Sequence, residues 1–188
     1  MNEIKIFSPA SVANISCGFD VLGVCLNNIG DEMVIRKTKK KGIVISKVHG
    51  DMDIPLDNKK NVAAISASSL LNKISINHGF EIEIFKGIKS GSGIGSSAAS
   101  SAGSVFGINK LIEKPFSKNE LIKFAMEGIH STPMVSNCSL RKSIPFLFVS
   151  IVFDKKSLSS SAAYPAIWAN AEGSNGTFTF NRLLISSS

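Results

Sequence analysis

Ten consecutive residues, nearly all of them small, carry the most specific chemistry in the sequence. They are Ser90, Gly91, Ser92, Gly93, Ile94, Gly95, Ser96, Ser97, Ala98 and Ala99. The glycines let the backbone turn tightly and bring several N–H groups close to one anion, because no Cβ stands in the way. A helix beginning directly afterwards adds its free amides and the positive end of its dipole. The run predicts a phosphate-binding loop, whose serine hydroxyls can meet phosphate oxygens or Mg²⁺.

The segments on either side distinguish this loop from a flexible linker. Residues 80–85 alternate between apolar and acidic side chains and form the clearest strand pattern in the chain. Residues 96–112 are rich in alanine, serine and apolar residues, which predicts a helix packed closely on a sheet. No Gly-Lys-Ser/Thr closes the loop, so it is not a Walker A motif, and its glycine spacing differs from the dinucleotide-binding fingerprint.

The order of the other predicted elements indicates an α+β domain. Further strands are expected at Ile4–Ser8, Gly18–Leu26, Met33–Lys37 and Ile43–Val48, and another within residues 146–153. Further helices are expected from Asn61 to about His78 and from Lys118 to about Gly128. Pro9 is expected to end the first strand, because proline cannot donate to a sheet. Ser117 and Glu120 form a capping-box pattern at the start of the last helix.

Composition restricts the class of protein. The chain has 188 residues, of which 44% are hydrophobic and 19% charged, as in globular proteins. No apolar run approaches the roughly 20 residues that cross a bilayer, and the first residues lack the pattern of a signal peptide. We therefore expect a cytoplasmic protein without a membrane partner. The three cysteines have no metal-ligand spacing and are expected to be reduced and buried.

A basic stretch raises the alternative of nucleic-acid binding. It comprises Arg36, Lys37, Lys39, Lys40 and Lys41, and the whole chain carries a formal charge of +7. Basic patches attract phosphate backbones. However, no aromatic residue is interleaved with these side chains. We therefore interpret the stretch as a solvated strand end or hairpin turn, and expect no nucleic-acid partner.

The phosphate loop resembles the second signature of the GHMP kinases, the family of galactokinase, homoserine kinase, mevalonate kinase and phosphomevalonate kinase. That signature usually reads Pro-x-x-x-Gly-Leu-Gly-Ser-Ser-Ala-Ala, and Lys89 stands here where the family has proline. The resemblance implies that residues 89–99 bind ATP. It also implies a ribosomal-protein-like mixed sheet with helices packed on one face, formed by residues 1–128, and places residues 129–188 outside the family pattern.

A second match points to one branch of the family. Residues 8–23 resemble the N-terminal signature of the homoserine kinases. There, the positions of Asn14 and Asp20 hold the amino-acid substrate, which suits the pairing of a carboxylate with an ammonium group. The alternative for Asp20 is a turn residue. The resemblance implies that ATP phosphorylates the side-chain hydroxyl of L-homoserine, a step of threonine biosynthesis, without a dedicated general base.

Two weaker matches complete the set. Ala125-Met126-Glu127-Gly128 corresponds to a family segment whose glutamate holds Mg²⁺ together with a loop serine, here Ser97 or Ser96. Carboxylate and hydroxyl oxygens are suitable ligands for Mg²⁺. The alternative for Glu127 is an exposed residue at a helix end. Asn61-Val62 resembles the Asn-hydrophobic step near the family's adenine pocket.

The resemblance ends near residue 128. The family histidine would fall near Val135, and His130 comes too early to replace it. No segment corresponds to the family's C-terminal domain. Two other interpretations therefore stay open: a nucleotide-binding remnant without turnover, and a GHMP kinase that acts on another small alcohol, such as a mevalonate-like one. A homodimer also stays open.

The serine-rich composition of residues 129–188 suggests that this segment is an out-of-frame translation of a homoserine kinase gene. Resequencing the coding DNA tests this hypothesis. We expect a shift of reading frame near codon 128. An intact single frame in several related isolates, ending at Ser188, would disprove it.

Overall fold

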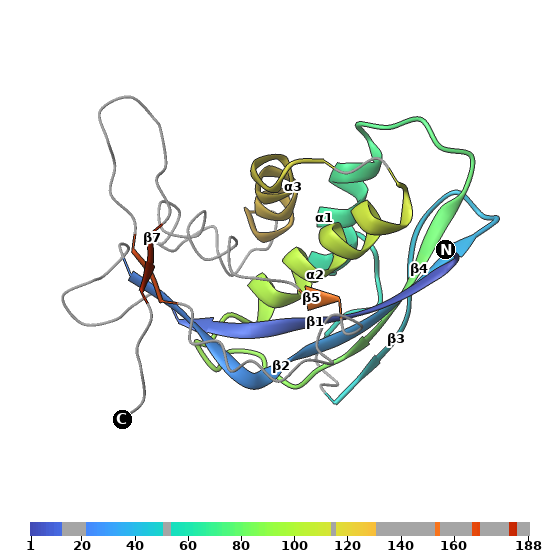
Figure 1. Ribbon diagram of the computed structural model, residues 1–188. Helices are drawn as coiled ribbons and strands as arrows, with labels where there is room; N and C mark the ends of the chain where they lie inside the picture. Colours follow the sequence, from blue (N-terminus) through green and yellow to red (C-terminus); the bar gives the residue numbers. More distant parts are fainter. Residues whose placement is uncertain are drawn as a thin grey trace.

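A computed structural model shows a mixed sheet with three helices on one face (Figure 1). It describes residues 1–12, 22–50, 54–113 and 116–130, and three short strands beyond them. The elements are β1 (Glu3–Val12), β2 (Leu22–Thr38), β3 (Gly42–His49), α1 (Val62–Leu71), β4 (Gly79–Phe85), α2 (Ser96–Leu111), α3 (Lys118–His130), β5 (Phe153–Asp154), β6 (Ile167–Ala169) and β7 (Asn181–Leu183). This arrangement confirms the predicted α+β class.

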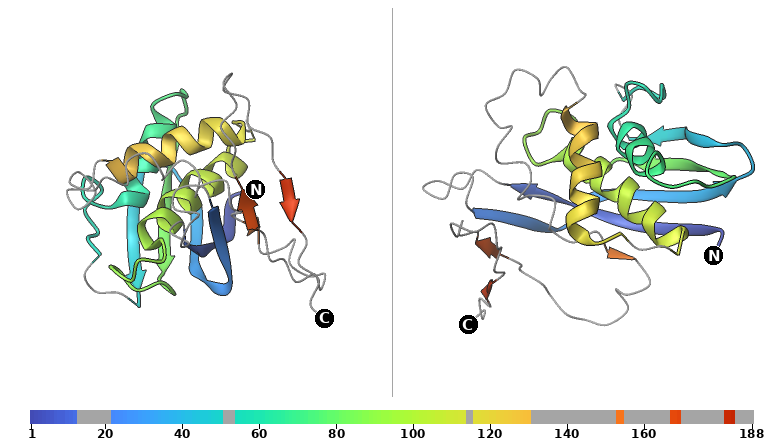
Figure 2. Two further views of the ribbon diagram at one scale, coloured as in Figure 1. Left: turned by 90° about the vertical axis from the view of Figure 1, so that its left-hand side faces the viewer. Right: turned by 90° about the horizontal axis from the view of Figure 1, so that it is seen from above.

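The strand order across the sheet is β3-β4-β2-β1-β5, and β6 pairs with both β2 and β7. β1 and β4 flank β2 and are both antiparallel to it. β3 and β4 are parallel, because α1 crosses over the sheet between them. The two views of Figure 2 show the helices gathered on the same side of the sheet. None of the helices in the described part of the chain is long and apolar enough to cross a membrane.

The first two strands run further than the sequence predicted. Pro9 does not end β1: it lies opposite Gly30 of β2, and the strand continues to Val12 after a shift of register between Pro9 and Ser11. Proline is tolerated at such an irregularity, where one ladder hydrogen bond is already lost. β2 is one strand of 17 residues that joins the two predicted separately. Residues 18–21 of the first prediction lie outside the described part of the chain.

The basic stretch ends β2 and leads to β3, but it is not a hairpin turn. β2 and β3 do not pair, because β4 lies between them. The chain at residues 39–41 therefore passes over the start of β4. Gly79 allows this crossing, since a Cβ there would overlap the carbonyl oxygens of Lys40 and Gly42. Arg36 lies on the other face of the sheet from the helices and pairs with Glu3 and Glu83.

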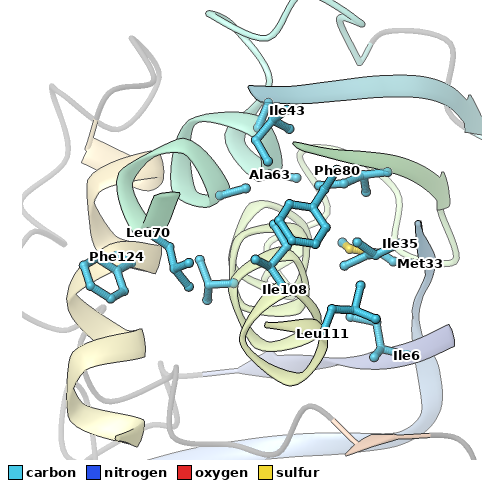
Figure 3. Packing of buried hydrophobic residues seen from close by; sticks show 14 of the residues in the cluster. Ile6, Met33, Ile35, Ile43, Ala63, Leu70, Phe80, Ile108, Leu111 and Phe124 are labelled. Carbon is cyan, nitrogen blue, oxygen red and sulfur yellow. The ribbon is translucent and has the colours of Figure 1, made fainter. Parts of the chain in front are cut away.

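The hydrophobic core lies between the sheet and the helices. Alternate residues of β1, β2 and β4 point toward the helices and are buried, as period-two patterning requires. Figure 3 shows side chains from these strands meeting those of all three helices. The cluster includes Ile4, Ile6, Met33, Ile35, Ile43, Phe80, Ile82, Ile84, Leu70, Ile108, Leu111 and Phe124.

α1 begins where the sequence predicts and ends earlier. Asn61 caps its first turn, because Oδ1 accepts from the amides of Ala63 and Ala64 at 3.0 and 3.4 Å. The helix stops at Leu71 and not near His78. Ile74 and Ile76 continue the apolar pattern, but they pack on the core from the turn that leads into β4. The apolar spacing in the sequence therefore indicates which residues are buried, but it does not indicate where the helix ends.

Glycines let α2 pack unusually close to the sheet. A Cβ at Gly103 would lie 2.6 Å from Ser8 Oγ, and one at Gly107 would lie 2.5 Å from Ile35 Cδ1. α2 therefore rests directly on β1 and β2, as predicted.

The capping box of α3 is also confirmed. Glu120 accepts from the Ser117 hydroxyl at 2.6 Å and from its amide at 2.9 Å. These contacts favour the charged carboxylate and lower the pKa of Glu120.

Gly128 provides a test of the close packing between α1 and α3. A Cβ there would overlap Ser66 Oγ and lie 2.7 Å from the Val62 carbonyl oxygen. Gly128→Ala gains helix propensity of about 1 kcal/mol, yet we expect the free energy of unfolding to fall by about 2 kcal/mol because of the overlap. Lys123→Ala on the exposed face of α3 is the control, expected within about 0.5 kcal/mol of the parent. Denaturant unfolding of the full chain measures both. A Gly128→Ala protein at least as stable as the parent would contradict this packing.

Candidate functional site

The glycine-rich run forms the loop between β4 and α2 that the sequence predicts. Gly91, Gly93 and Gly95 have φ angles of 75°, 77° and 79°, in the left-handed region that favours glycine. A Cβ at Gly91 or Gly93 would meet nothing within 4 Å, so the space beside the backbone there is open. At Gly95 a Cβ would lie 2.8 Å from the Ser11 hydroxyl. The outer side of the loop at Gly91 and Gly93 is therefore free of side chains that would block an approaching ligand.

The glycine loop and the first turn of α2 together form a continuous run of backbone, here called the cradle. Gly95 occupies the N-cap position and no side chain caps the helix, nor does its first turn contain an acidic residue. The amides at this helix start are therefore available to a ligand, and the helix dipole favours an anion. Ser97 is exposed in this turn. The Ser96 hydroxyl instead donates to the Ile88 carbonyl at 3.3 Å. Of the two serines proposed for Mg²⁺, only Ser96 thus has its hydroxyl bound to the loop backbone.

Beneath the loop lies a buried ion pair between Asp31 of β2 and Lys86, which follows β4. Glu32 pairs with Phe85 in the antiparallel register of these strands, so one further step brings Asp31 opposite Lys86. The Lys86 ammonium contacts Asp31 Oδ2, and the two side chains are 1% and 0% exposed. Such burial is costly unless both charges are fully partnered.

Further hydrogen bonds satisfy this pair. Asp31 Oδ1 accepts from the amides of Gly87 and Ile88, each at 3.1 Å. Lys86 also donates to the Ser100 hydroxyl at 3.1 Å and the Ser96 carbonyl at 3.4 Å. Burial raises the pKa of the Asp31 carboxyl above its ordinary value, while the Lys86 charge and these hydrogen bonds act in the opposite direction. The cluster connects both ends of the loop to β2.

A second buried cluster joins the helices that carry Ser97 and Glu127. The Ser101 hydroxyl donates to the Ala125 carbonyl at 2.6 Å and contacts the Ser66 hydroxyl of α1. Ser101 lies one helical turn after Ser97, and Ala125 lies two residues before Glu127. Glu127 is exposed near the end of α3. Ser97 and Glu127 therefore lie on neighbouring helices.

Among the described residues, no group of three or more His, Cys, Asp or Glu side chains could hold a metal ion. A site built from one hydroxyl, one carboxylate and the oxygens of a bound triphosphate needs no such group. Ser97 and Glu127 carry oxygen donors of the kind that Mg²⁺ prefers, and both are exposed.

The structure describes two of the four remaining predicted site residues, Lys89 and Asn61. Lys89 is exposed at the start of the loop, and its carbonyl accepts from the Ser92 amide at 3.2 Å. Asn61 is 2% exposed, and its side chain caps α1 and donates to the Pro55 carbonyl at 2.8 Å. Its amide is thus used within the fold. Asn14 and Asp20 lie outside the described residues.

Asp31 and Lys86 were not identified from the sequence, although a signal was present. Asp31 continues the inward row of Met33 and Ile35, and Lys86 continues the inward row of Ile82 and Ile84. A charged residue in an inward row requires a buried partner. Two such residues of opposite charge, at neighbouring strand ends, predict an ion pair.

Residues 61–138 match the family described as GHMP kinases N terminal domain. Homoserine kinases are similar over the N-terminal part: that of Methanococcus maripaludis is 41% identical over 130 residues, which is 68% of this chain and 42% of that protein. The Xanthomonas campestris enzyme is 36% identical over 129 residues, with 68% and 40% covered. The chain thus spans less than half the length of these relatives.

Solved structures show the same fold. The homoserine kinase of Cytophaga hutchinsonii has a TM-score of 0.75 at 33% identity, covering 99% of this chain and 53% of that one. The L. major mevalonate kinase has a TM-score of 0.58 at 12% identity, covering 99% and 52%. The second likeness concerns the fold alone.

Gly93 and Gly42 provide a matched test of the loop. Both have positive φ, and a Cβ added at either would meet nothing within 4 Å, so an alanine at either costs about 1 kcal/mol of backbone strain. Only Gly93→Ala places a methyl group in the cradle. We expect it to weaken binding of inorganic triphosphate by about tenfold, whereas Gly42→Ala binds as the parent does. Calorimetric titration measures both. Equal affinities for the two variants would exclude the glycine loop as the anion site.

Proposed function

We propose that this chain, whose N-terminal part is a GHMP kinase N-terminal domain, binds ATP with Mg²⁺ and phosphorylates the side-chain hydroxyl of L-homoserine. One observation carries the proposal: three positive-φ glycines lead into the uncapped start of α2, in a fold shared with a homoserine kinase. Anion binding of this kind suits a triphosphate. Sequence similarity to homoserine kinases over 130 residues supports the substrate.

In this proposal, different residues of the site bind the triphosphate and the metal ion. The amides of residues 91–97 would hold the triphosphate, except that of Ser92, which donates to the Lys89 carbonyl. Ser97 and Glu127 would hold Mg²⁺. The metal supplies neutralisation of the phosphate charge when bound. The homoserine hydroxyl oxygen forms a bond to the γ-phosphorus and loses its proton to a phosphate oxygen or to solvent. The bond from that phosphorus to the bridging oxygen breaks, and ADP leaves with the bonding electrons. Most of the rate enhancement in this scheme comes from positioning and charge stabilisation.

Asn14 and Asp20 complete the proposal as the substrate-binding residues. An aspartate can pair with the ammonium of an amino acid, and an asparagine amide can bond its carboxylate or hydroxyl. The reaction belongs to threonine biosynthesis, and we assign it to the cytoplasm, where ATP is available. Asn61 contributes by ordering the start of α1 near the adenine.

A second candidate is a nucleotide-binding protein without turnover. It remains a candidate because a glycine loop before an uncapped helix start can bind a phosphate whether or not a transfer reaction follows. A change of substrate within the family is a third candidate, since a mevalonate kinase shares the fold. The Asn14 and Asp20 pattern favours an amino acid over a mevalonate-like alcohol.

The experiment is a coupled assay of ADP release with the purified full chain, ATP, Mg²⁺ and L-homoserine, run beside direct measurement of ATP binding. We expect ADP release that depends on homoserine and is at least about tenfold slower with other alcohols. ATP binding without homoserine-dependent release would identify the remnant. Faster ADP release with a mevalonate-like alcohol would identify that alcohol as the substrate in place of homoserine.

Glu127→Gln tests the metal ligand in the same assay. Because an amide is a poorer Mg²⁺ ligand than a carboxylate, we expect the Mg²⁺ concentration for half-maximal activity to rise about tenfold or more. Glu113→Gln makes the same change at the opposite end of α2 from the loop, where Glu113 is exposed. It should leave the Mg²⁺ dependence unchanged. Identical curves for both variants would remove Glu127 from the metal site.

A further inference from the structure

We infer that Asp31 and Lys86 are positioning residues, which hold the two ends of the phosphate loop at a fixed separation and so keep its amides directed at one anion. The inference rests on the proposed function for the identity of that anion, the triphosphate of ATP. The contacts themselves belong to the fold and can be tested without a substrate.

The two residues bind opposite ends of the loop. On the β4 side, Asp31 Oδ1 accepts from the backbone amides of Gly87 and Ile88, at 3.1 Å each. On the α2 side, Lys86 donates to the carbonyl of Ser96, the first residue of the helix, at 3.4 Å, and to the Ser100 hydroxyl at 3.1 Å. The ion pair between Asp31 and Lys86 joins these two sets of bonds.

The ammonium of Lys86 is bound to partners within the fold and does not extend into the open side of the loop. Its side chain is 1% exposed, and its ammonium donates to a carboxylate, a hydroxyl and a carbonyl. An ammonium group has three donors, so all of them are engaged. A lysine next to a glycine-rich loop would by position alone be taken for a phosphate ligand. Here it acts through the backbone of the loop.

The loop between these anchors needs external support. Three glycines give it more conformational freedom than any other residues would, and ordering that freedom on binding costs free energy. Two backbone bonds constrain its middle: Ser11 N to the Ile94 carbonyl at 3.0 Å, and Ser92 N to the Lys89 carbonyl at 3.2 Å. Fixing both ends in advance reduces the ordering that must accompany ATP binding, which is preorganisation.

The serine at position 100 strengthens the connection. Its hydroxyl lies between the two charges, accepting from Lys86 and donating to Asp31 Oδ2 at 3.3 Å. Ser100 is 7% exposed and lies one turn into α2. The helix start is thus tied to the ion pair at two points, Ser96 and Ser100, which fixes its rotation as well as its height above the sheet.

Stability and positioning can be separated by replacing both charges together. Breaking one member of a buried pair leaves an uncompensated charge, whereas replacing both is often neutral for folding. The double variant Asp31→Asn/Lys86→Met keeps the size of both side chains and removes the charges. The matched control is Lys5→Met/Glu32→Gln, which removes a 2.9 Å ion pair whose members are 48% and 30% exposed. Glu32 directly follows Asp31 on β2, with its side chain on the opposite face.

Two measurements on the full chain test the inference. We expect Asp31→Asn/Lys86→Met to weaken ATP binding at least about tenfold while the KM for homoserine changes less than about twofold. Backbone amides of residues 87–100 should exchange with deuterium faster, without a matching change in β1 or β3. The control variant should match the parent in both. ATP affinity equal to the parent, or faster exchange spread evenly over the sheet, would overturn the positioning role.

A milder variant covers the case in which the double variant does not fold. Ser100→Ala removes two hydrogen bonds of the cluster and no charge, and we expect local amide exchange to accelerate and ATP affinity to fall about threefold. Unchanged exchange and affinity would overturn the inference. If the parent chain itself binds no ATP, the proposed function fails, and the exchange pattern alone then decides whether Asp31 and Lys86 hold the loop.

Discussion

The carboxylate of Asp31 and the ammonium of Lys86 lie together beneath the phosphate loop, and both are almost completely withdrawn from water. Taking each ion out of water costs several kcal/mol, so the arrangement is tolerated only where the charges are fully partnered. Backbone amides, a serine hydroxyl and a carbonyl supply those partners. A shift of β2, β4 or α2 would leave a buried charge without a partner. The need to keep both charges partnered therefore restricts the positions of β2, β4 and α2 near the loop more than apolar packing does.

The two halves of α2 have different roles: one contributes to stability and the other to the position of the helix start. Its second half contributes Val105, Ile108 and Leu111 to the apolar core, where burial contributes about 25 cal/mol per Å² without directional demands. Its first half buries Ser100 and Ser101, which gain little from apolar burial but form directional hydrogen bonds. The core holds the helix on the sheet, and the serines determine where its N-terminus points. The anion-binding end is therefore the end with the stricter geometry.

The features predicted correctly from the sequence are those decided within a few residues. The tight turns at the loop glycines and the capping box of α3 depend on local chemistry. The errors are non-local: Pro9 stays within β1 because β2 offers a bulged partner, and β4 inserts between β2 and β3 although residues 39–78 separate it from β2 in the sequence. Asp31 and Lys86 fall between these cases. Each inward row was visible in the sequence, but their pairing depended on a strand order that the sequence did not show.

The ion pair also bears on Lys89, which stands where the signature that the loop resembles has proline. A proline would fix φ near −65° and reduce the freedom of the unfolded chain, which stiffens a loop before it binds. Lys89 gives no such restriction. In this chain, however, Lys89 directly follows Gly87 and Ile88, whose amides are bound to Asp31. The Ser92 amide then closes a turn onto the Lys89 carbonyl. Hydrogen bonds before and after position 89 thus supply the rigidity that a pyrrolidine ring would provide, and the lysine side chain stays exposed.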